Sequence, residues 1–570
     1  MKRQAQTAGT RSKAHLRRKR LGRFYTPEPV AVAMTSWAVR SQTDKALDPS
    51  YGGCAFLTAV ASRLRDLGAR RPFSQVFGVD IDKTASRYIN AAAGRSAESG
   101  NFISGDFLQT TPAQTNWAVQ CVVGNPPYVR HHTMSAKQLL AARRVLEGAG
   151  ATDLPKTAGY WTYFLLHSLQ FLTPAGRLAL VLPAAFLNAR YATAVRRVVL
   201  ARFRFVTVLV VRERLFSDAE ESSVIVLAEG FDQPHEGSSI EAVDGTRDIQ
   251  AVCRRETKPT RRILQSDSFG WKATLLSEPA RAVLSHLDPQ TRPDVATLGS
   301  LATVAIGTVT GANEFFVLSS TEARRLGLPE SALRPIIAST ASLPPLVLDA
   351  QDRQALEATD ARSLLFCPGP RTKHDAVVRY VRSAAAKKVK KNGHCKRRNP
   401  WYMIQDLKAP SVFVPYVNDY SPRLVLNRIG AGCTNAVHRL WWKKETSEAV
   451  EKTLALSALT SLTALSAEIC GRSYGGGALK LELGELRALW LAKPTLANDV
   501  LADAFERATK ALAGNRRTEA RQIADETVLS LGLRLTRAEI QCLSEAFHSL
   551  RRLRMGERQR SVEGSEAVPA

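Results

Sequence analysis

Short apolar runs alternate with longer amphipathic stretches from Phe24 to about Gly230. The runs have the length of buried strands, and the stretches between them have the length and apolar spacing of helices. Strands are predicted at Val76–Ile81, Val119–Val123, Arg177–Leu182, Phe205–Val211 and Ser223–Ala228. Helices are predicted at Pro29–Arg40, Phe56–Leu67, Thr84–Ala93, Trp161–Leu172 and Tyr191–Phe203. This alternation predicts an α/β fold, a mostly parallel sheet with helices on both faces, which binds ligands at the carboxyl ends of its strands.

The pattern changes after about residue 236. Apolar runs become short and irregular, as at Phe315–Leu318, Ser411–Tyr416 and Arg423–Leu426, and a helical stretch follows at about Thr495–Arg558. Mixed α+β structure with a helical end is therefore expected here. The expected parts are a basic, disordered arm (1–23), the α/β domain (24–235), a connector (236–295), a mixed α+β domain (296–495) and a helical C-terminal segment with a frayed tail (496–570).

The charge balance is strongly basic. Lys and Arg number 79 against 52 Asp and Glu, which gives a formal net charge of +27 and a pI of about 10.1. Such a surplus attracts polyanions and is typical of proteins that bind nucleic acids. Candidate phosphate contacts cluster with an aromatic residue at Lys387, Lys388, Lys390, Lys391, Arg397, Arg398 and Trp401.

The cysteines and the hydropathy of the sequence give no sign of a metal-binding, disulfide-bonded, secreted or membrane protein. The eight cysteines are scattered without a C-x-x-C pair, so neither a metal site nor a disulfide framework is indicated. Reduced thiols fit a cytoplasmic protein. The basic N-terminus lacks the apolar stretch of a signal peptide, and the sequence has no apolar run near the roughly 20 residues of a membrane helix. We expect no metal and no membrane partner.

The residues Asn125, Pro126, Pro127 and Tyr128 follow an apolar run that ends at Gly124. Two prolines fix φ twice and remove two donors, and a residue before proline is held extended. The stiff loop suits a planar substrate with an amino group, because the ring can stack on it while the amide oxygen and a loop carbonyl accept its N–H groups. For these residues alone, a proline-rich turn with Tyr128 in the core is the alternative.

Three acidic residues precede this loop, each at the end of an apolar segment. Asp48 begins Asp48-Pro49-Ser50-Tyr51-Gly52, a glycine-containing loop that lets a ligand approach the backbone near a helix N-terminus. Asp80 ends the next predicted strand, where an acid can bind ribose hydroxyls. Asp106 is placed to accept an adenine amino group. Each could instead cap a loop, but all three in this order predict a nucleoside cofactor.

These motifs resemble the TaqI-like, gamma-class N6-adenine DNA methyltransferases. The resemblance begins at Gly22-Arg23-Phe24-Tyr25-Thr26-Pro27 and continues through Asp48-Pro49, Asp80, Asp106 and Asn125-Pro126-Pro127-Tyr128 in the family's order. It is looser in the second half, at Gly311–Phe316 and at Gly471–Lys480, and covers about residues 22–555. One departure is Cys54, where the family usually has glycine; Gly53 beside it could absorb the turn.

The resemblance implies a Rossmann-like methyltransferase domain followed by a target-recognition domain. S-adenosylmethionine would be held by Thr26, Asp48, Pro49, Gly52, Asp80 and Asp106. Asn125 and Pro126 would accept hydrogen bonds from adenine N6, while Tyr128 and Phe216 sandwich the flipped base. The expected partners are double-stranded DNA and a separately encoded restriction endonuclease, and a monomer is expected.

Two other methyltransferase classes stay open at this point. Enzymes that methylate a protein glutamine amide also use Asn-Pro-Pro-Tyr, because that amide is likewise a flat, poorly nucleophilic nitrogen. They are much shorter and have no segment like Phe24-Tyr25-Thr26-Pro27. An RNA base methyltransferase would suit the same charge. A DNA-binding protein with a decayed methyltransferase domain is disfavoured, because Asp48, Asp80 and Asp106 are all present.

Overall fold

The structure is a computed structural model that describes residues 26–93, 100–129, 134–149, 151–155, 158–212, 215, 223–256, 271–369, 372–474 and 477–555. It contains two compact units. The first comprises the described residues up to Leu275, with Arg472–Gly477 and the end of the last helix, and the second comprises Leu276–Gly471 and Ala478–Arg551.

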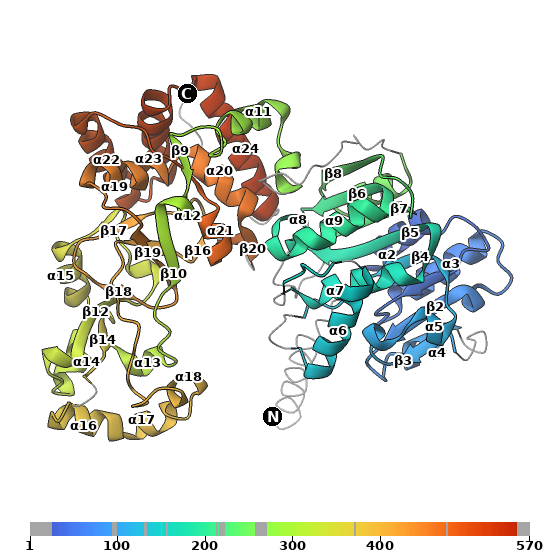
Figure 1. Ribbon diagram of the computed structural model, residues 1–570, viewed down its shortest axis with the longest axis horizontal. Coiled ribbons are helices and arrows are strands. Elements are labelled where there is room, and N and C mark those ends of the chain that lie inside the picture. Colours follow the sequence, from blue (N-terminus) through green and yellow to red (C-terminus); the bar gives the residue numbers. More distant parts are fainter. Residues whose placement is uncertain are drawn as a thin grey trace, which may run out of the picture. The chain divides into compact units, whose positions relative to one another are not determined.

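An eight-stranded sheet forms the centre of the first unit, in the order β3-β2-β1-β4-β5-β7-β6-β8 (Figure 1). Its strands are β1 (Ala46–Asp48), β2 (Val76–Asp80), β3 (Phe102–Ser104), β4 (Val119–Gly124), β5 (Leu172–Pro183), β6 (Phe203–Val211), β7 (Ser223–Phe231) and β8 (Gly237–Val243). The neighbours from β3 to β5 are parallel, β7 is antiparallel to both β5 and β6, and β8 is parallel to β6. The mostly parallel sheet expected from the sequence is confirmed.

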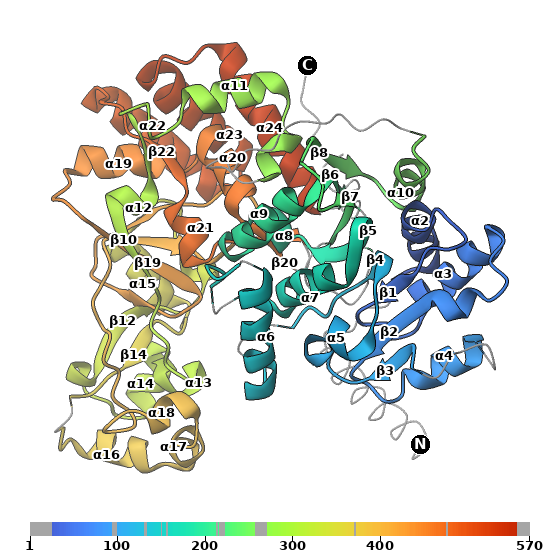
Figure 2. The same ribbon diagram turned by 45° about the vertical axis from the view of Figure 1, so that its right-hand side comes forward.

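Helices cover both faces of this sheet (Figure 2). Successive residues of β1 and β4 point to opposite sides, so Leu47 and Val122 pack in one apolar cluster while Ala46 and Val123 pack in another. The helices in the first cluster are α6 (Ala136–Ala149), α7 (Tyr160–Ser168), α8 (Ala185–Asn188) and α9 (Thr193–Arg202). Those in the second are α2 (Glu28–Ala38), α3 (Ala55–Asp66), α4 (Ser86–Ala93) and α10 (Thr246–Cys253). A short helix, α5, spans Pro112–Thr115.

The strand order reverses at the middle of the sheet. From β1 the chain moves outward through β2 and β3, and it then returns to the other side of β1 as β4. The loops that follow β1 and β4 therefore leave in opposite directions. In open α/β sheets ligands bind at such a switch point, outside the carboxyl ends of the strands. Asp48 ends β1 and Gly124 ends β4, so both sequence motifs lie at this switch point.

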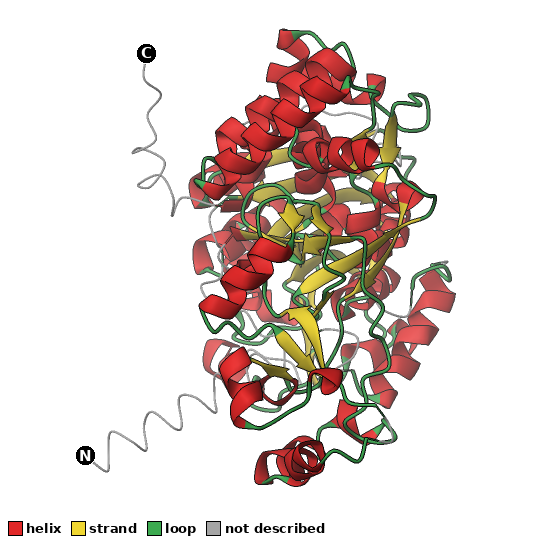
Figure 3. Cartoon of the chain, turned by 90° about the vertical axis from the view of Figure 1, so that its left-hand side faces the viewer, coloured by secondary structure: helices red, strands yellow, loops and turns green. Residues whose placement is uncertain are grey.

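The second unit combines small sheets with helices (Figure 3). One sheet has the order β10-β19-β15-β17-β13 and another β11-β14-β12-β18. Its strands are β9 (Val295–Thr297), β10 (Ala302–Ile306), β11 (Val317–Leu318), β12 (Leu333–Ile337), β13 (Val347–Leu348), β14 (Leu364–Phe366), β15 (Val412–Pro415), β16 (Val417–Asn418), β17 (Val425–Asn427), β18 (Gly432–Cys433), β19 (Val437–Trp442), β21 (Ala478–Lys480) and β22 (Trp490–Ala492). The strand β20 (Arg472–Tyr474) is assigned to the first unit.

The helices of the second unit are α11 (Glu278–His286), α12 (Leu298–Leu301), α13 (Asn313–Phe316), α14 (Ser320–Arg325), α15 (Ala350–Ala358), α16 (Asp375–Arg382), α17 (Ala384–Val389), α18 (Gly393–Lys396), α19 (Glu448–Ser457), α20 (Ser461–Cys470), α21 (Leu483–Arg487), α22 (Asn498–Ala513) and α23 (Arg517–Ala524). The last helix, α24 (Arg537–Met555), begins in this unit and ends in the first. In Figure 1, α16–α18 lie at the end of the unit opposite to α22 and α23.

The sheet of the first unit continues beyond residue 235, where the sequence suggested that the domain ends. β8 pairs with β6 along its whole length, from Phe205 opposite Gly237 to Val211 opposite Val243. Its sequence, Gly-Ser-Ser-Ile-Glu-Ala-Val, has few apolar residues, because an edge strand needs fewer than a central one. No single helix among the described residues has the length and apolar character needed to cross a membrane, although the bent pair α19 and α20 meets those two criteria when taken together.

Candidate active site

The loop Asn125–Tyr128 begins where β4 ends between β1 and β5. Pro126 is buried, while Asn125, Pro127 and Tyr128 are half-buried. The carbonyl of Asn125 accepts a hydrogen bond of 3.1 Å from Ser50 Oγ, so this loop is tied to the loop that follows β1. Further along, the carbonyl of Val129 accepts the main-chain N–H of Tyr160 at 3.0 Å. Both ends of the motif are thus anchored to other elements.

Asp48 lies at the end of β1 with only 1% of its surface exposed. Its Oδ1 accepts the main-chain N–H of Ser50 at 2.9 Å. Burial, and then the nearby charge of Asp80, raise the pKa of this carboxyl to about 8. A Cβ at Gly124 would stand 2.8 Å from the same Oδ1 and 3.2 Å from Pro49 Cδ. The glycine that precedes Asn125 is therefore required by the close approach of Asp48.

Asp80, at the end of the neighbouring strand β2, accepts a hydrogen bond from the loop that follows β1. Its Oδ2 accepts the main-chain N–H of Gly52 at 2.8 Å and its Oδ1 that of Asp82 at 2.7 Å. Gly52 has φ of 43°, a left-handed conformation that glycine adopts without a steric penalty.

Cys54 is the second left-handed residue of this loop, with φ of 67°, and it precedes the first residue of α3. The expectation that Gly53 would absorb the turn is wrong, because the positive φ values of the loop fall on Gly52 and Cys54. The thiol is buried, and that burial, with the charges of Asp48 and Asp80, raises its pKa to about 12. Cys54 is therefore a protonated packing residue and not a nucleophile.

Asp106 follows β3 and caps a short 3₁₀ turn. Its Oδ1 accepts the main-chain N–H of Leu108 at 3.1 Å and the hydroxyl of Tyr160 at 3.2 Å, while Oδ2 accepts Gln109 Nε2 at 3.1 Å. Burial, and then the charge of Asp106, raise the pKa of Tyr160. Through its N–H and its hydroxyl, Tyr160 connects Asp106 with the segment after Tyr128.

Thr26 immediately precedes Pro27 and α2, and it is 7% exposed. Its Oγ1 is buried and makes no hydrogen bond within the described part of the chain. A buried hydroxyl without a partner is costly, by roughly 1–3 kcal/mol, and a bound polar ligand can remove that cost. Thr26 and the three acidic residues form a set of one hydroxyl and three carboxyl groups that fits a cationic, hydroxyl-bearing nucleoside such as S-adenosylmethionine.

Two residues of this site were missed from the sequence alone. Ser50 lies inside the loop that the sequence singled out, but its partner is the carbonyl of Asn125, 75 residues away. The sequence predicts a helix that begins at Trp161, one residue after Tyr160, whereas α7 begins at Tyr160 itself. An aromatic residue after Gly159 at a helix start was the available signal. Phe216 lies outside the described residues.

The basic cluster lies in the second unit and contains two kinds of residue. Lys387, Lys388, Lys390, Lys391 and Arg397 are exposed on and around α17 and α18. Arg398, however, donates to the carbonyls of Thr310 and Val309 at 2.8 and 2.5 Å. Trp401 packs on Phe315, with ring centroids 5.6 Å apart. The structure therefore places these last two side chains in the local fold and leaves the five cations exposed.

Comparisons with known proteins agree with this arrangement. The "N-6 DNA Methylase" family model matches residues 11–265, and the "Type II methyltransferase M.Eco57I, C-terminal domain" model matches residues 269–529. The chain is 24% identical to the type II methyltransferase M.AccI of Acinetobacter calcoaceticus over 82% of this chain and 85% of that protein. It is 22% identical to M.XamI of Xanthomonas campestris pv. amaranthicola over 85% of this chain and 86% of that protein.

Solved structures show the same fold at low sequence identity. The type IIL restriction–modification enzyme MmeI, solved in complex with DNA, matches with a TM-score of 0.53 and 12% identity over 90% of this chain and 73% of that one. The type ISP restriction–modification enzyme LlaGI matches with a TM-score of 0.52 and 11% identity over 86% of this chain and 54% of that one. The matches to the N-6 DNA methylase model and to the type II methyltransferases M.AccI and M.XamI do not favour a glutamine-amide or RNA substrate.

Proposed function

We propose that this chain, which belongs to the N-6 DNA methylases of restriction–modification systems, transfers a methyl group from S-adenosylmethionine to N6 of an adenine in duplex DNA. The observation that carries the proposal is the hydrogen bond from Ser50 to the carbonyl of Asn125. It joins the loop that begins with Asp48 to the loop that begins with Asn125, at the switch point of the sheet. A methyl donor held by the first loop would therefore face a base held by the second.

The acidic residues and Thr26 would hold the cofactor, which supplies an activated sulfonium methyl group. Buried Asp48 suits a positively charged part of the ligand, because a cation recovers the free energy that burial of the carboxylate costs. Asp80, at the end of β2, would accept hydrogen bonds from ribose hydroxyls, and Asp106 suits an adenine amino group. Tyr160 holds Asp106 in place. The buried hydroxyl of Thr26 would gain a hydrogen bond.

The residues Asn125, Pro126, Pro127 and Tyr128 would act on the target adenine. Its N6 is a poor nucleophile because the lone pair is delocalised into the ring. The Asn125 side-chain oxygen and the Pro126 carbonyl would accept its two hydrogens, which favours a more tetrahedral nitrogen with its lone pair directed at the methyl group. The two prolines keep these acceptors fixed. Tyr128 would stack on the base after it has left the duplex, a step that costs a few kcal/mol.

The second unit would hold duplex DNA as a target-recognition domain. Exposed Lys387, Lys388, Lys390, Lys391 and Arg397 would contact phosphates, which gives salt-sensitive affinity without sequence preference. We further propose a cytoplasmic monomer that works beside a separately encoded endonuclease. The type II methyltransferases to which the chain is similar support the restriction–modification setting.

The test is expression in a host that lacks DNA methylation, followed by modification-sensitive single-molecule sequencing of its DNA. We expect N6-methyladenine at every copy of one short motif with the wild-type chain and none with Asn125→Ala. Isothermal titration should show that the variant keeps its affinity for S-adenosylmethionine, because Asn125 touches the base and not the cofactor. Unmodified adenine with folded wild-type protein present, or N4-methylcytosine instead, would contradict the proposal.

A further inference from the structure

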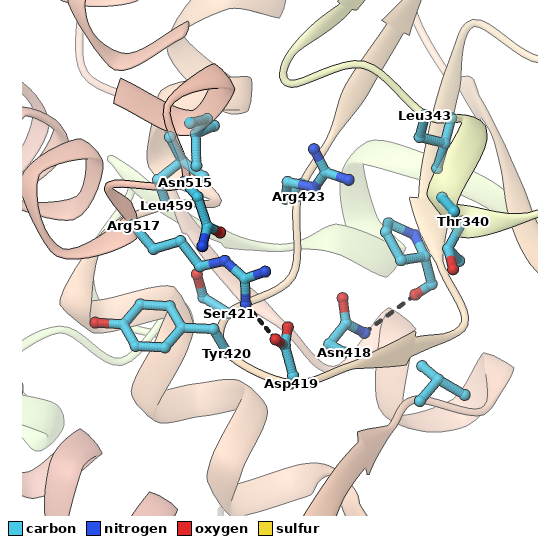
Figure 4. Close-up of a pocket in the computed structure, with 14 residues that line it drawn as sticks. Thr340, Leu343, Asn418, Asp419, Tyr420, Ser421, Arg423, Leu459, Asn515 and Arg517 are labelled. Carbon is cyan, nitrogen blue, oxygen red and sulfur yellow. Dashed lines mark hydrogen bonds and ion pairs between the residues drawn. The ribbon is translucent and has the colours of Figure 1, made fainter. Parts of the chain in front are cut away.

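The second unit contains a cavity of about 340 Å³ (Figure 4). Its walls come from the turn Thr340–Ser342, from the connection between β15 and β17, and from the junction of α22 and α23. None of its lining residues belongs to the Asn125 loop or to the basic cluster at α16–α18. The sequence motifs therefore assign no role to this cavity.

Two arginines enter the cavity from different elements. Arg423 precedes β17, and its Nη1 donates to the carbonyls of Pro344 at 3.0 Å and Pro345 at 3.3 Å. These bonds hold the guanidinium in place, while its Nε and Nη2 have no acceptor within the described part of the chain. Arg517 begins α23 and pairs through Nη1 with Asp419, whose side chain is 70% exposed. Both guanidiniums thus keep N–H groups available for a ligand.

The charges around the cavity favour an anion. Arg423 and Arg517 contribute two positive charges, against one negative charge from Asp419. Burial, and then the charge of Arg517, lower the pKa of Arg423, as expected when two guanidiniums lie close together. Behind the wall, Arg521 contacts the hydroxyl of Tyr420 and Arg551 lies over its ring at 5.1 Å. Their charges add to the positive potential of the cavity.

Neutral donors complete the lining. Thr340 and Ser421 present hydroxyls and Asn515 presents a carboxamide, and these side-chain groups make no hydrogen bond within the described residues. Figure 4 shows Asn515, Arg517 and Ser421 to one side of Arg423, and Thr340 and Leu343 to the other. Guanidiniums combined with hydroxyl and amide donors match the several acceptor oxygens of a phosphate group. A carboxylate ligand would use fewer of these donors.

We propose that this cavity binds a phosphate group, held by the guanidiniums of Arg423 and Arg517 and by the side chains of Asn515 and Ser421. Two sources share this chemistry: a backbone phosphate of bound DNA, or the phosphate of a free small molecule. Binding at this site does not depend on methyl transfer. The active-site proposal and this one can therefore fail separately.

Two variants test the site, with one matched control. Asn515→Asp places a negative charge among the donors, and it suits the left-handed φ of 57° at this position, which Asp tolerates nearly as well as Asn. Arg517→Gln removes one guanidinium. Arg507→Gln is the control, because it removes the same charge from an exposed i,i+4 pair with Asp503 on α22. Circular dichroism and the melting temperature establish that all the variants fold.

The first measurement is titration of inorganic phosphate into DNA-free protein by isothermal calorimetry. The second is the salt dependence of duplex DNA binding by fluorescence anisotropy. Phosphate binding that is at least tenfold weaker in Asn515→Asp than in Arg507→Gln supports the site. A slope of log K against log salt that is smaller by about 0.9 in Arg517→Gln than in the control identifies a DNA phosphate. An unchanged slope together with the loss of phosphate binding identifies a small molecule.

The proposal is overturned if neither variant differs from Arg507→Gln in either measurement. Adenine methylation is assayed in the same preparations. If the wild-type chain does not methylate adenine, the proposed function is contradicted, but the phosphate-binding results remain valid.

Discussion

Ser50 Oγ donates a hydrogen bond of 3.1 Å to the main-chain carbonyl of Asn125. Ser50 also donates its main-chain N–H to Asp48, so one residue contacts both the buried carboxyl at the end of β1 and the loop at the end of β4. The two loops come from strands that are neighbours in the sheet but far apart in the sequence. Their relative position therefore depends on a few such contacts.

Replacing Ser50 with alanine should loosen the two loops without unfolding the protein. A hydrogen bond of this kind contributes about 1 kcal/mol, so we expect kcat to fall about fivefold. The affinity for S-adenosylmethionine should change less, because the main-chain bond to Asp48 remains. Single-turnover methylation and cofactor titration measure the two effects. Ser74→Ala, which removes an exposed hydroxyl bonded to the carbonyl of Arg71, serves as the control.

A side chain at Gly124 should disrupt its packing against Asp48. In Gly124→Ala the new Cβ would stand 2.8 Å from Asp48 Oδ1, closer than carbon and oxygen tolerate. We expect a loss of about 2 kcal/mol in the free energy of unfolding and at least tenfold weaker cofactor binding. In the matched control Gly105→Ala, the nearest heavy atom is Ile103 Cγ2 at 3.6 Å, an ordinary contact. Equal effects of the two variants in urea unfolding would contradict the packing argument.

The buried carboxyl of Asp48 should make stability depend on pH. The folded chain keeps this proton up to about pH 8, whereas the unfolded chain loses it near the ordinary pKa of 3.8. The folded state therefore binds more protons in this window, and the free energy of unfolding falls by up to about 1.4 kcal/mol per pH unit as the pH rises. Relative to wild type, Asp48→Asn should remove this decline between about pH 5 and about pH 8. Urea unfolding across this range, without cofactor, measures the difference, and parallel curves would show that Asp48 is ionised when folded.

Loss of the Tyr160 hydroxyl should weaken cofactor binding. In Tyr160→Phe, Asp106 loses a hydrogen bond of 3.2 Å to one of its carboxylate oxygens. Hydrogen bonds to charged groups contribute about 1.5–3 kcal/mol, so we expect the Kd for S-adenosylmethionine to rise by about tenfold or more. Tyr163→Phe, on the same helix, removes a hydroxyl that has no hydrogen-bond partner among the described residues, and it should leave the Kd unchanged. A rise of the Kd in both variants would indicate a general packing effect of α7.

The left-handed conformation of Cys54 should decide which residues fit there. We expect Cys54→Gly to keep the stability within about 1 kcal/mol, because relief of the backbone offsets the lost burial of the thiol. Cys54→Val should cost about 2 kcal/mol or more, since a β-branched side chain is strained at positive φ. Thermal unfolding of the two variants makes the comparison. A valine variant as stable as the glycine variant would mean that the loop can rearrange.

The sequence alone determined the chemical groups of the site and the class of fold. Alternating strands and helices predicted the parallel sheet, and Asp48, Asp80, Asp106 and Asn125 each ended an apolar segment. Both signals are local, because periodicity is set by the residues of one element and a strand end by the next few residues. No local signal of this kind predicted that β8 belongs to the sheet. It is a strand because it pairs with β6, and its composition alone does not indicate one.

Only the tertiary structure decided which groups meet. It showed that Gly124 must be glycine because Asp48 lies against it, and that Tyr160 supports Asp106 from a helix 54 residues later. It also separated the exposed lysines around α17 from Arg398 and Trp401, which the composition of the segment could not distinguish. The physical reason is that such contacts depend on how the strands and helices pack, and packing joins residues that no short sequence pattern relates.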